Sequence, residues 1–338
     1  MTGRDIRAEG LPLDPAPPSG EAAHRVTLLL VPGFALMSYS SALEPLRAAN
    51  TLAGRELYRW RHASIDGRPV LASNGMTFAV EGGLDAADEA DMVLVCAGGN
   101  PALFDEAAVF AWLRAMASRG AIIGGVSGGP YILAKAGLLD GSRATVHWEH
   151  APAFGEEFPA VRLIASLYQI DGRRMTCAGG VAALDMMHEV IAAAHGPELA
   201  RAVSDWFLQA HVRPGSGGQR LGPRARLGIV NQKLEQVVER MEAAIEEPLS
   251  RAALAGAANL SLRQLDRLFQ AHLGTSVERF YLGLRLDRAR ELLRQTSLPV
   301  VEVALATGFG SASHFSRSFR DRFGLSPRGE RQPDRSRP

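Results

Sequence analysis

The sequence predicts an α/β domain built on a parallel sheet, followed by an all-α domain with two helix-turn-helix motifs. Three observations support this prediction. Strand-like and helix-like runs alternate between residues 26 and 194, a stretch rich in glycine and proline follows at 213–224, and the last quarter of the chain contains one pattern twice. Alternating strands and helices are typical of a parallel sheet that helices cover on both faces.

The strand candidates of the first domain are short apolar runs. Runs such as 26–31 (VTLLLV) and 92–97 (MVLVCA) are continuously apolar, as a strand buried on both faces requires. The helix candidates have apolar stripes at helical spacing. Along the chain we expect strands at 26–31, 60–65, 92–97, 121–126, 143–146, 161–166 and 174–178, and helices at 40–52, 107–118, 130–136 and 181–194.

A flexible linker is predicted between the two domains. Residues 213–224 (RPGSGGQRLGPR) contain four glycines and two prolines, a composition typical of linkers. The predicted domains are 25–212 and 227–330, and the linker is 213–226. Residues 1–24, which are polar and rich in proline and glycine, and residues 331–338 are predicted to be disordered tails.

Beyond the linker the sequence has helical patterns only. The segment 261–277 aligns without a gap with 311–327. Each copy follows a short alanine-rich helix and a turn, so we predict a duplicated helix-turn-helix, which suits two successive major grooves of a DNA duplex. The two copies share Ser261/Ser311, Arg267/Arg317, Phe269/Phe319, Gly274/Gly324 and Ser276/Ser326, and helices are expected at 230–245, 251–256, 262–273, 277–295, 300–306 and 312–323.

The charge is divided unevenly between the two parts of the chain. Residues 220–338 hold 20 Lys and Arg against 13 Asp and Glu, whereas residues 1–219 hold 17 against 23. A basic module on an acidic body favours a polyanionic partner at one end only. Of those 20 basic residues 19 are Arg, which suits bidentate contacts with phosphate and guanine.

Composition excludes several classes of protein. Cys96 and Cys177 lie inside apolar runs, so we expect buried free thiols in a reducing compartment and no disulfide framework. No apolar run reaches the about 18 residues needed to span a bilayer, and residues 1–24 lack the features of a signal peptide. We expect a cytoplasmic, nucleoid-associated protein with no membrane partner, no cofactor and no metal.

The exposed starts of the two recognition helices carry donors and acceptors suited to base edges and phosphates. The alternative is a pair of solvated amphipathic helices in an ordinary bundle, which would make the duplication and the basic bias coincidences. The apolar side chains expected to bury each motif are Ala255, Leu265, Leu268, Phe269, Ala304, Phe315 and Phe319. The DNA-binding candidates are Ser261, Arg263, Gln264, Arg267, Ser311, Ser313, His314 and Arg317.

Residues 249–328 resemble the DNA-binding domain of the AraC family of transcription regulators. The resemblance is carried by Gly308-Phe309, by 314–320 (HFSRSFR) and by the closing 324–327 (GLSP). It implies a sequence-specific reader of double-stranded DNA.

A second pattern raises the possibility of an enzyme. Residues 125–129 (GVSGG) fit the Gly-x-Ser-x-Gly nucleophile elbow, and they lie at a predicted turn from strand to helix, as that motif requires. A serine hydrolase using Ser127 is therefore an alternative. Its partners would come from His147, His150, Asp185 and His188, but no acid and histidine pair stands out among them.

Residues 25–212 resemble the PfpI/ThiJ-like domain, whose fold is that of class I glutamine amidotransferases and is flavodoxin-like. The matching stretches are 32–34, 43–50, 96–99, 144–149 and 178–186. Regulators that fuse this domain to an AraC-type reader are called GlxA-like. Enzymes of this fold carry a Cys at the elbow, where this chain has Ser127, so the resemblance implies a binding pocket without catalysis.

Within this family the chain resembles regulators of glycine betaine and carnitine catabolism, in the stretches 44–50, 54–60, 136–141, 146–149 and 299–304. A trimethylammonium group is held by an aromatic face and a carboxylate, which Trp148 and Glu44 would supply, and the carboxylate of a betaine would suit the amides at 127–129. Core packing of Trp148, an exposed Glu44 and a structural His147 remain the alternatives. The ligand-binding candidates are Glu44, Gly98, Gly99, Ser127, Gly128, His147 and Trp148.

Together these observations predict a DNA-binding transcription activator, not an enzyme, that a small metabolite such as a quaternary amine controls. We expect a homodimer that contacts RNA polymerase. Two alternatives are an amidase-like or hydrolase-like enzyme that uses Ser127 and binds DNA secondarily, and a constitutive DNA-binding protein whose first domain only dimerises.

Overall fold

A computed structural model describes residues 23–331 except 88, 221 and 297. The chain forms two compact units that divide between Gln219 and Arg220, inside the predicted linker. The predicted tails lie outside the described residues apart from residues 23, 24 and 331, and strand β1 begins at His24. No helix in the described part of the chain is both long enough and apolar enough to cross a membrane.

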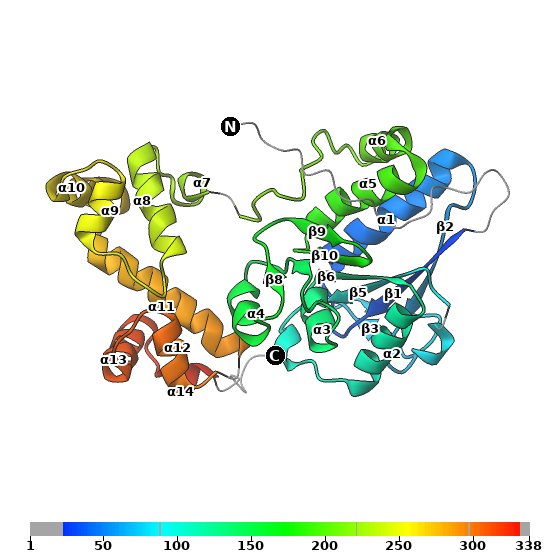
Figure 1. The fold of residues 1–338 in the computed structure, drawn as a ribbon, viewed down its shortest axis with the longest axis horizontal. Helices are drawn as coiled ribbons and strands as arrows, with labels where there is room; N and C mark the ends of the chain where they lie inside the picture. The colour runs from blue at the N-terminus through cyan, green and yellow to red at the C-terminus, as the bar shows by residue number, and fades with distance from the viewer. Residues whose placement is uncertain (1–22, 88, 221, 297, 332–338) are drawn as a thin grey trace. The chain divides into compact units, whose positions relative to one another are not determined.

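The first unit is built on a six-stranded sheet in the order β2-β1-β5-β6-β10-β9 (Figure 1). The first five of these strands are mutually parallel, which confirms the predicted α/β class. Their bounds are β1 His24–Leu30, β2 Tyr58–Ala63, β5 Met92–Ala97, β6 Ile122–Ser127, β9 Tyr168–Asp171 and β10 Arg174–Cys177, and two short pairs, β3 Val70–Leu71 with β4 Thr77–Phe78 and β7 Arg143–Ala144 with β8 Arg162–Leu163, lie outside this sheet.

The edge strand β9 was not predicted, and it runs antiparallel to β10. Only Gly172 and Arg173 separate the two strands, and Gly172 has φ +58°. An Asp-Gly pair between two strand-forming runs is a strong signal for a tight hairpin, because glycine adopts positive φ without a steric penalty. Asp171-Gly172 therefore held the missing information.

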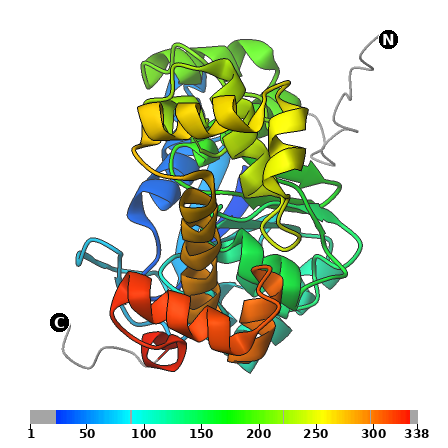
Figure 2. The same cartoon turned by 90° about the vertical axis from the view of Figure 1, so that its left-hand side faces the viewer.

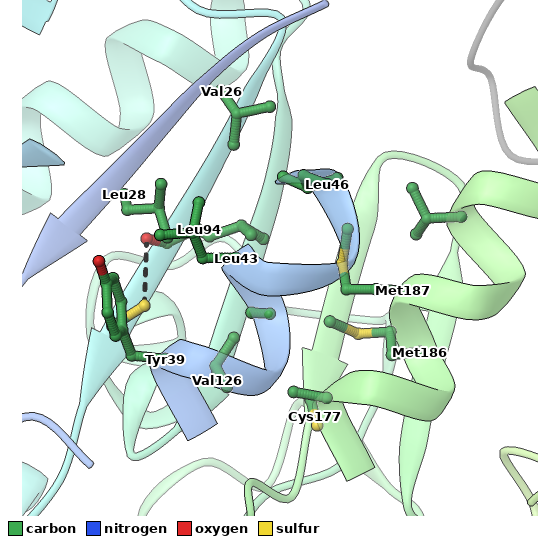
Figure 3. Close-up of a cluster of buried hydrophobic side chains, with 14 of the residues drawn as sticks. Val26, Leu28, Tyr39, Leu43, Leu46, Leu94, Val126, Cys177, Met186 and Met187 are labelled. Atoms are coloured by element: carbon green, nitrogen blue, oxygen red, sulfur yellow. Dashed lines mark hydrogen bonds between the residues drawn. The ribbon is translucent and has the colours of Figure 1, made fainter. Parts of the chain in front are cut away.

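Helices cover both faces of the sheet. On one face lie α1 Leu36–Ala53, α5 Ala182–His195 and α6 Pro197–Trp206, and on the other lie α2 Ala107–Ser118, α3 Gly129–Lys135 and α4 Ala151–Glu157. Alternate residues of each strand serve the two layers, so that Leu28 and Leu94 meet α1 and α5, while Leu29 and Val95 meet α2 and α3. Figure 3 shows part of the first layer, in which Leu43 and Leu46 of α1 lie between Leu28 and Leu94 of the sheet and Met186 and Met187 of α5. Two 3₁₀ turns, η1 Asp85–Ala87 and η2 Pro101–Leu103, complete the unit.

The second unit is helical throughout the described residues. Its long helix α11 has one helix-turn-helix at each end (Figure 2). Helices α10, α11, α12 and α13 have the predicted bounds, and α9 ends one residue later than predicted. The elements are α7 Pro223–Leu227, α8 Gln232–Ala243, α9 Arg251–Ala257, α10 Leu262–Leu273, α11 Val277–Gln295, α12 Val300–Ala306, α13 Ala312–Phe323 and α14 Pro327–Arg331.

The two helix-turn-helix motifs share one turn geometry, with a single extra residue in the second. Asn259 (φ +52°) and Gly308 (φ +76°) occupy the same left-handed position, and the amides of Leu260 and Phe309 bond back to Ala255 O and Ala304 O. Asparagine tolerates this conformation. Glycine is needed at 308 because a Cβ there would lie 2.6 Å from Pro248 Cγ. The extra residue is Gly310. It explains why α12 starts 49 residues after α9, whereas α13 starts 50 residues after α10.

The shared Gly-x-Ser ends join one helix to the next. Gly274 and Gly324 cap the recognition helices in the left-handed conformation, with φ +64° and +77°. Two residues later Ser276 Oγ accepts the amide of Arg279 at the start of α11, and Ser326 Oγ accepts the amide of Gly329 in α14. The shared pattern is thus a stop signal followed by a start signal.

The first half of the predicted linker is bound to the first unit. The Arg213 guanidinium holds Asp185 Oδ2 at 2.6 and 2.9 Å, and Asp185 Oδ1 accepts the backbone amide of Arg213 and the Gln209 side chain. Asp185 lies in α5 and is fully buried. A buried carboxylate needs such partners because its desolvation is costly.

We predict that Arg213→Met destabilises the first unit by about 2–4 kcal/mol, since it leaves the Asp185 charge buried without its cation. Urea unfolding of the full chain measures this. The matched control is Arg68→Met, because Arg68 pairs with Asp66 at a site where the side chains are 84% and 57% exposed; it should cost less than about 0.5 kcal/mol. Equal losses in the two variants would contradict the assigned role of Arg213.

A second prediction concerns pH. His195 packs edge-on against Tyr58, with ring centroids 5.1 Å apart, and burial, helped by nearby His24, lowers the pKa of His195 from 6.5 to about 4. The unfolded chain therefore binds this proton more readily, so stability is fully present above pH 6.5 and is lost as pH falls toward 4.

His195→Phe keeps a ring at this position and removes the titration. Its melting temperature should fall less than that of the wild type between about pH 7 and pH 5. The exposed His211→Phe serves as control and should behave like the wild type. If the two variants track each other, His195 does not contribute to the acid sensitivity.

Candidate functional site

The recognition helices α10 and α13 bury one face and expose the other. Leu265 and Phe269 in α10 and Phe315 and Phe319 in α13 are fully buried, as predicted, and Leu268 is partly buried. All eight predicted DNA-binding residues are exposed: Ser261, Arg263, Gln264, Arg267, Ser311, Ser313, His314 and Arg317. The polar faces of the helices are therefore accessible in the isolated chain.

Three of these eight residues already have a structural role. Ser261 and Gln264 form a capping box, in which Ser261 Oγ accepts the Gln264 amide and Gln264 Oε1 accepts the Ser261 amide. Ser311 Oγ accepts the His314 amide at 3.4 Å. Of the other five, His314 packs against Phe309, with ring centroids 5.6 Å apart. Arg317 makes only a long bond of 3.5 Å to Ser313 O. In the described part of the chain, the side chains of Arg263, Arg267 and Ser313 make no hydrogen bond or ion pair.

The arginines of the second unit fall into two groups, those that bond within the unit and those that stay exposed on the recognition helices. Several arginines stabilise its frame: Arg285 donates to the carbonyls of Thr307 and Gly308 and stacks 4.2 Å above the Phe309 ring. Arg322 donates to both carboxylate oxygens of Asp287. The Glu330 side chain, only 3% exposed, forms ion pairs with Arg290 and Arg294. In the described recognition helices, the exposed arginines that form no ion pair are Arg263, Arg267, Arg317 and Arg320.

Helix α11 sets the spacing between the two motifs. It contains 19 residues, which gives roughly 28 Å at 1.5 Å per residue. Successive major-groove faces of B-DNA lie ~34 Å apart. A helix of this length suits two recognition helices that enter neighbouring grooves on one side of a duplex.

In the first unit, loops at the carboxyl ends of four strands meet around Ser127. Gly98 follows β5 and lies so close to the loop after β1 that a Cβ on it would be 2.7 Å from Gly33 O. A Cβ on Gly179, after β10, would lie 2.8 Å from Ser127 Cβ. Gly128 bonds through its amide to Ala97 O. In open α/β sheets this edge is where ligands bind.

The Gly-x-Ser-x-Gly pattern is explained by packing. A Cβ on Gly129 would lie 2.1 Å from Val95 O, and one on Gly125 would lie 2.5 Å from Pro130 N. Both glycines therefore let α3 approach β5 and β6 at backbone distance. Ser127 between them has φ +61°, a strained conformation for a residue with a Cβ. The elbow geometry is present, but its glycines serve the fold.

Ser127 lacks the partners of a nucleophile. Among the described residues, neither a histidine nor a carboxylate hydrogen-bonds to its hydroxyl. Two suggested partners are engaged elsewhere: Asp185 with Arg213, and His188 with Ser204 Oγ at 2.8 Å. Burial raises the pKa values of the Cys96 and Cys177 thiols to about 12, so neither is a thiolate at neutral pH.

His147 and Trp148 lie in the turn between β7 and α4. Their rings are 5.2 Å apart, both side chains are partly buried, and Glu149 Oε2 is 3.8 Å from His147 Nδ1. Burial lowers the pKa of His147, and Glu149 partly offsets this effect, so the imidazole is neutral at neutral pH. The segment is tied to β10, because Thr145 N donates to Thr176 Oγ1 at 2.9 Å.

One group in this turn has the composition of a metal site, which the sequence did not predict. Among the described residues, ligand atoms of His147, Glu149 and His150 lie within 4.8 Å of one another. Metal binding through His147 Nδ1 would require this atom to give up the Glu149 amide, which donates to it at 3.4 Å. No metal was predicted here, and the Nδ1 atom of His147 is already engaged by this amide.

Glu44 and the glycine amides are less available than the sequence suggests. Glu44 lies in α1 and pairs with Arg47 one turn later, at 2.7 Å. The Gly128 amide is used within the fold, and Gly99 has φ +61° in the loop after β5. Sequence analysis missed Ser38, a buried α1 residue whose hydroxyl accepts the Gly180 amide at 2.7 Å and fixes the loop that touches Ser127.

Comparison with known proteins agrees with both units. Residues 254–332 match the helix-turn-helix domain family, and residues 24–193 match the DJ-1/PfpI family. One similar solved structure is the crystal structure of an AraC family transcriptional regulator from Pseudomonas putida, with 26% sequence identity and a TM-score of 0.50. The match covers 54% of this chain and 99% of the Pseudomonas putida chain.

Two relatives match across nearly the whole chain. The HTH-type transcriptional regulator CdhR of Pseudomonas aeruginosa (strain PAO1) is 48% identical over 303 residues, 90% of each chain. GbdR of the same strain is 44% identical over 316 residues, which cover 94% of this chain and 86% of the relative. The chain therefore belongs to the GlxA-like family of transcriptional regulators, which join a DJ-1/PfpI domain to a DNA-binding helix-turn-helix domain of AraC type.

Proposed function

We propose that the first unit is a non-catalytic sensor for a small metabolite and that it controls transcription through the second unit. The observation that carries this proposal is the environment of Ser127, an elbow at the carboxyl edge of the sheet whose hydroxyl meets no base or carboxylate partner within the described ranges. A hydroxyl without an activating partner is a poor nucleophile. The geometry therefore favours binding over turnover, and the protein acts as a regulator without enzymatic activity.

The proposed effector is a quaternary amine such as glycine betaine or carnitine. The resemblance to regulators of that catabolism suggests this class, and the turn after β7 supports it. Trp148 offers a partly exposed aromatic face, and the neighbouring Glu149 carboxylate is 52% exposed. An aromatic face with a nearby carboxylate attracts such cations. Glu44 would take part only by exchanging Arg47 for the ligand.

For the second unit we propose that both recognition helices read bases, with Arg263, Arg267, Ser313, His314 and Arg317 as the contacting residues. They are exposed at the starts and outer faces of the helices, where base edges are reached in related motifs. Gln264 would join them by leaving its capping box, while Ser261 and Ser311 would position the helix starts against phosphates. We further propose that the protein is a homodimeric activator that contacts RNA polymerase.

Arg317→Ala tests the DNA interface. Loss of a bidentate contact should weaken binding by about 1–3 kcal/mol, or roughly 5- to 150-fold, and relax the preference at one base position. The probe is a fragment that the wild-type protein selects from random DNA, measured by gel shift and footprinting. Arg240→Ala, an exposed arginine in α8, is the control and should bind as the wild type does. An unchanged footprint for Arg317→Ala would remove this residue from the interface.

A thermal-shift screen with glycine betaine, carnitine, choline and amino acids tests the sensor. A ligand at 100 times its Kd stabilises the folded state by about 2.7 kcal/mol, so a quaternary amine should raise the melting temperature measurably. Trp148→Leu should abolish this shift, whereas Ser127→Ala should keep both the shift and the transcriptional response. A shift with amino acids alone would refute the ligand class, and an amidase turnover that Ser127→Ala removes would favour the enzyme.

A further inference from the structure

The segment 213–219, which we call the strap, follows the surface of the first unit and ends where the second unit begins. Its composition predicts a flexible linker, yet the structure holds it at both ends and in the middle. Arg213 provides the first attachment through its ion pair with buried Asp185. The other two attachments lead directly to the proposed effector site.

The middle of the strap lies against the start of β9. Gly215 O accepts the amide of Leu167 at 2.9 Å. A Cβ on Gly215 would lie 3.0 Å from both the ring and the carbonyl oxygen of Tyr168, and one on Gly217 would lie 3.0 Å from Leu167 Cδ1. The glycines of the strap therefore permit close backbone contact, and their role here is not to add freedom.

The last residue of the strap, Gln219, reaches three buried acceptors. Its Nε2 lies 3.0 Å from Thr145 Oγ1, 2.9 Å from Val146 O and 2.7 Å from Ser166 O. Thr145 and Ser166 are fully buried. One side-chain amide from the linker thus ties together two segments that lie 53 and 74 residues earlier in the chain.

Two of these acceptors belong to the segment that presents His147 and Trp148. Val146 O is the carbonyl directly before His147, and Thr145 is anchored to β10 through Thr176. The loop that follows this strand contains Gly179, where a Cβ would lie 2.8 Å from Ser127 Cβ. A displacement of 146–148 would therefore change the acceptor geometry around Gln219.

Gln219 is also the last residue of the first unit. Arg220 begins the second unit, and α7 starts at Pro223. We propose that Gln219 is the coupling residue of this regulator: it links the effector-binding turn to the linker, so that occupancy of the turn changes how firmly the strap is held and how free the reader is to move. This coupling rests on the proposed effector site at His147 and Trp148.

The first test needs no effector. Hydrogen–deuterium exchange is followed on the full chain for wild type, Gln219→Leu and the milder Gln219→Asn, whose shorter amide cannot reach all three acceptors. Amides in 144–148 and 166–168 should exchange about three- to tenfold faster in both variants, as expected for the loss of one or two hydrogen bonds. Ser216→Ala, at an exposed position of the same strap, is the control and should match wild type. Unchanged exchange in the variants would overturn the coupling.

The second test adds glycine betaine. Calorimetry measures its binding, and a promoter reporter measures the ratio of output with and without it. We expect both Gln219 variants to bind glycine betaine within about threefold of wild type while the output ratio falls to about 1; a ratio equal to that of wild type would overturn the coupling. If glycine betaine does not bind the wild type, the proposed effector fails, and the exchange result alone then decides the coupling. Should Gln219→Leu not fold, Gln219→Asn decides both tests.

Discussion

The buried carboxylate of Asp185 is the constraint on which the organisation of this chain depends. A fully buried charge must be paired, and the cation that pairs it comes from Arg213, 28 residues later. This pair fixes the chain as it leaves the last helix of the first unit, and the strap that follows can then reach Leu167 and Thr145. The boundary between the two units consequently lies after Gln219, although the glycine-rich composition begins six residues earlier.

A second constraint acts where α3 meets the sheet. Gly125 and Gly129 bring backbone against backbone, and the chain can turn from β6 into α3 only by placing Ser127 at positive φ. The same geometry presents a nucleophile in enzymes of this fold, yet it specifies only the position of a side chain. A nucleophilic reaction requires in addition a thiol or an activating partner. Position 127 carries a serine, and none of the described residues activates its hydroxyl. This chain thus has the elbow geometry without the activating chemistry, and the relatives that match it over most of its length are named as transcriptional regulators.

Local signals explain what could be predicted from the sequence. The recognition helices were located to the residue because Ser261, Ser311, Gly274 and Gly324 are caps that act within a few residues of themselves. The antiparallel strand β9 was missed, although Asp171-Gly172 marks its turn, because only one of its four residues is buried and it lacks the continuous apolar run of the central strands. The strap was interpreted as flexible because its partners lie up to 74 residues away and composition carries no information about them. The Arg47 partner of Glu44 follows ordinary helical spacing and could have been anticipated.

The two helix-turn-helix motifs share their backbone geometry but differ in the side chains that they expose. They share the turn conformation at Asn259 and Gly308, the glycine caps and one arginine, Arg267 or Arg317. At the exposed helix starts, however, the first copy has Arg263 and Gln264 where the second copy has Ser313 and His314. Arginine favours guanine, whereas serine and histidine are less selective donors and acceptors. With the proposed base contacts, a duplex that satisfies both halves would not be a simple repeat of one half-site. Its two grooves would carry different sequences in a fixed order, which would give the bound protein a direction on the DNA.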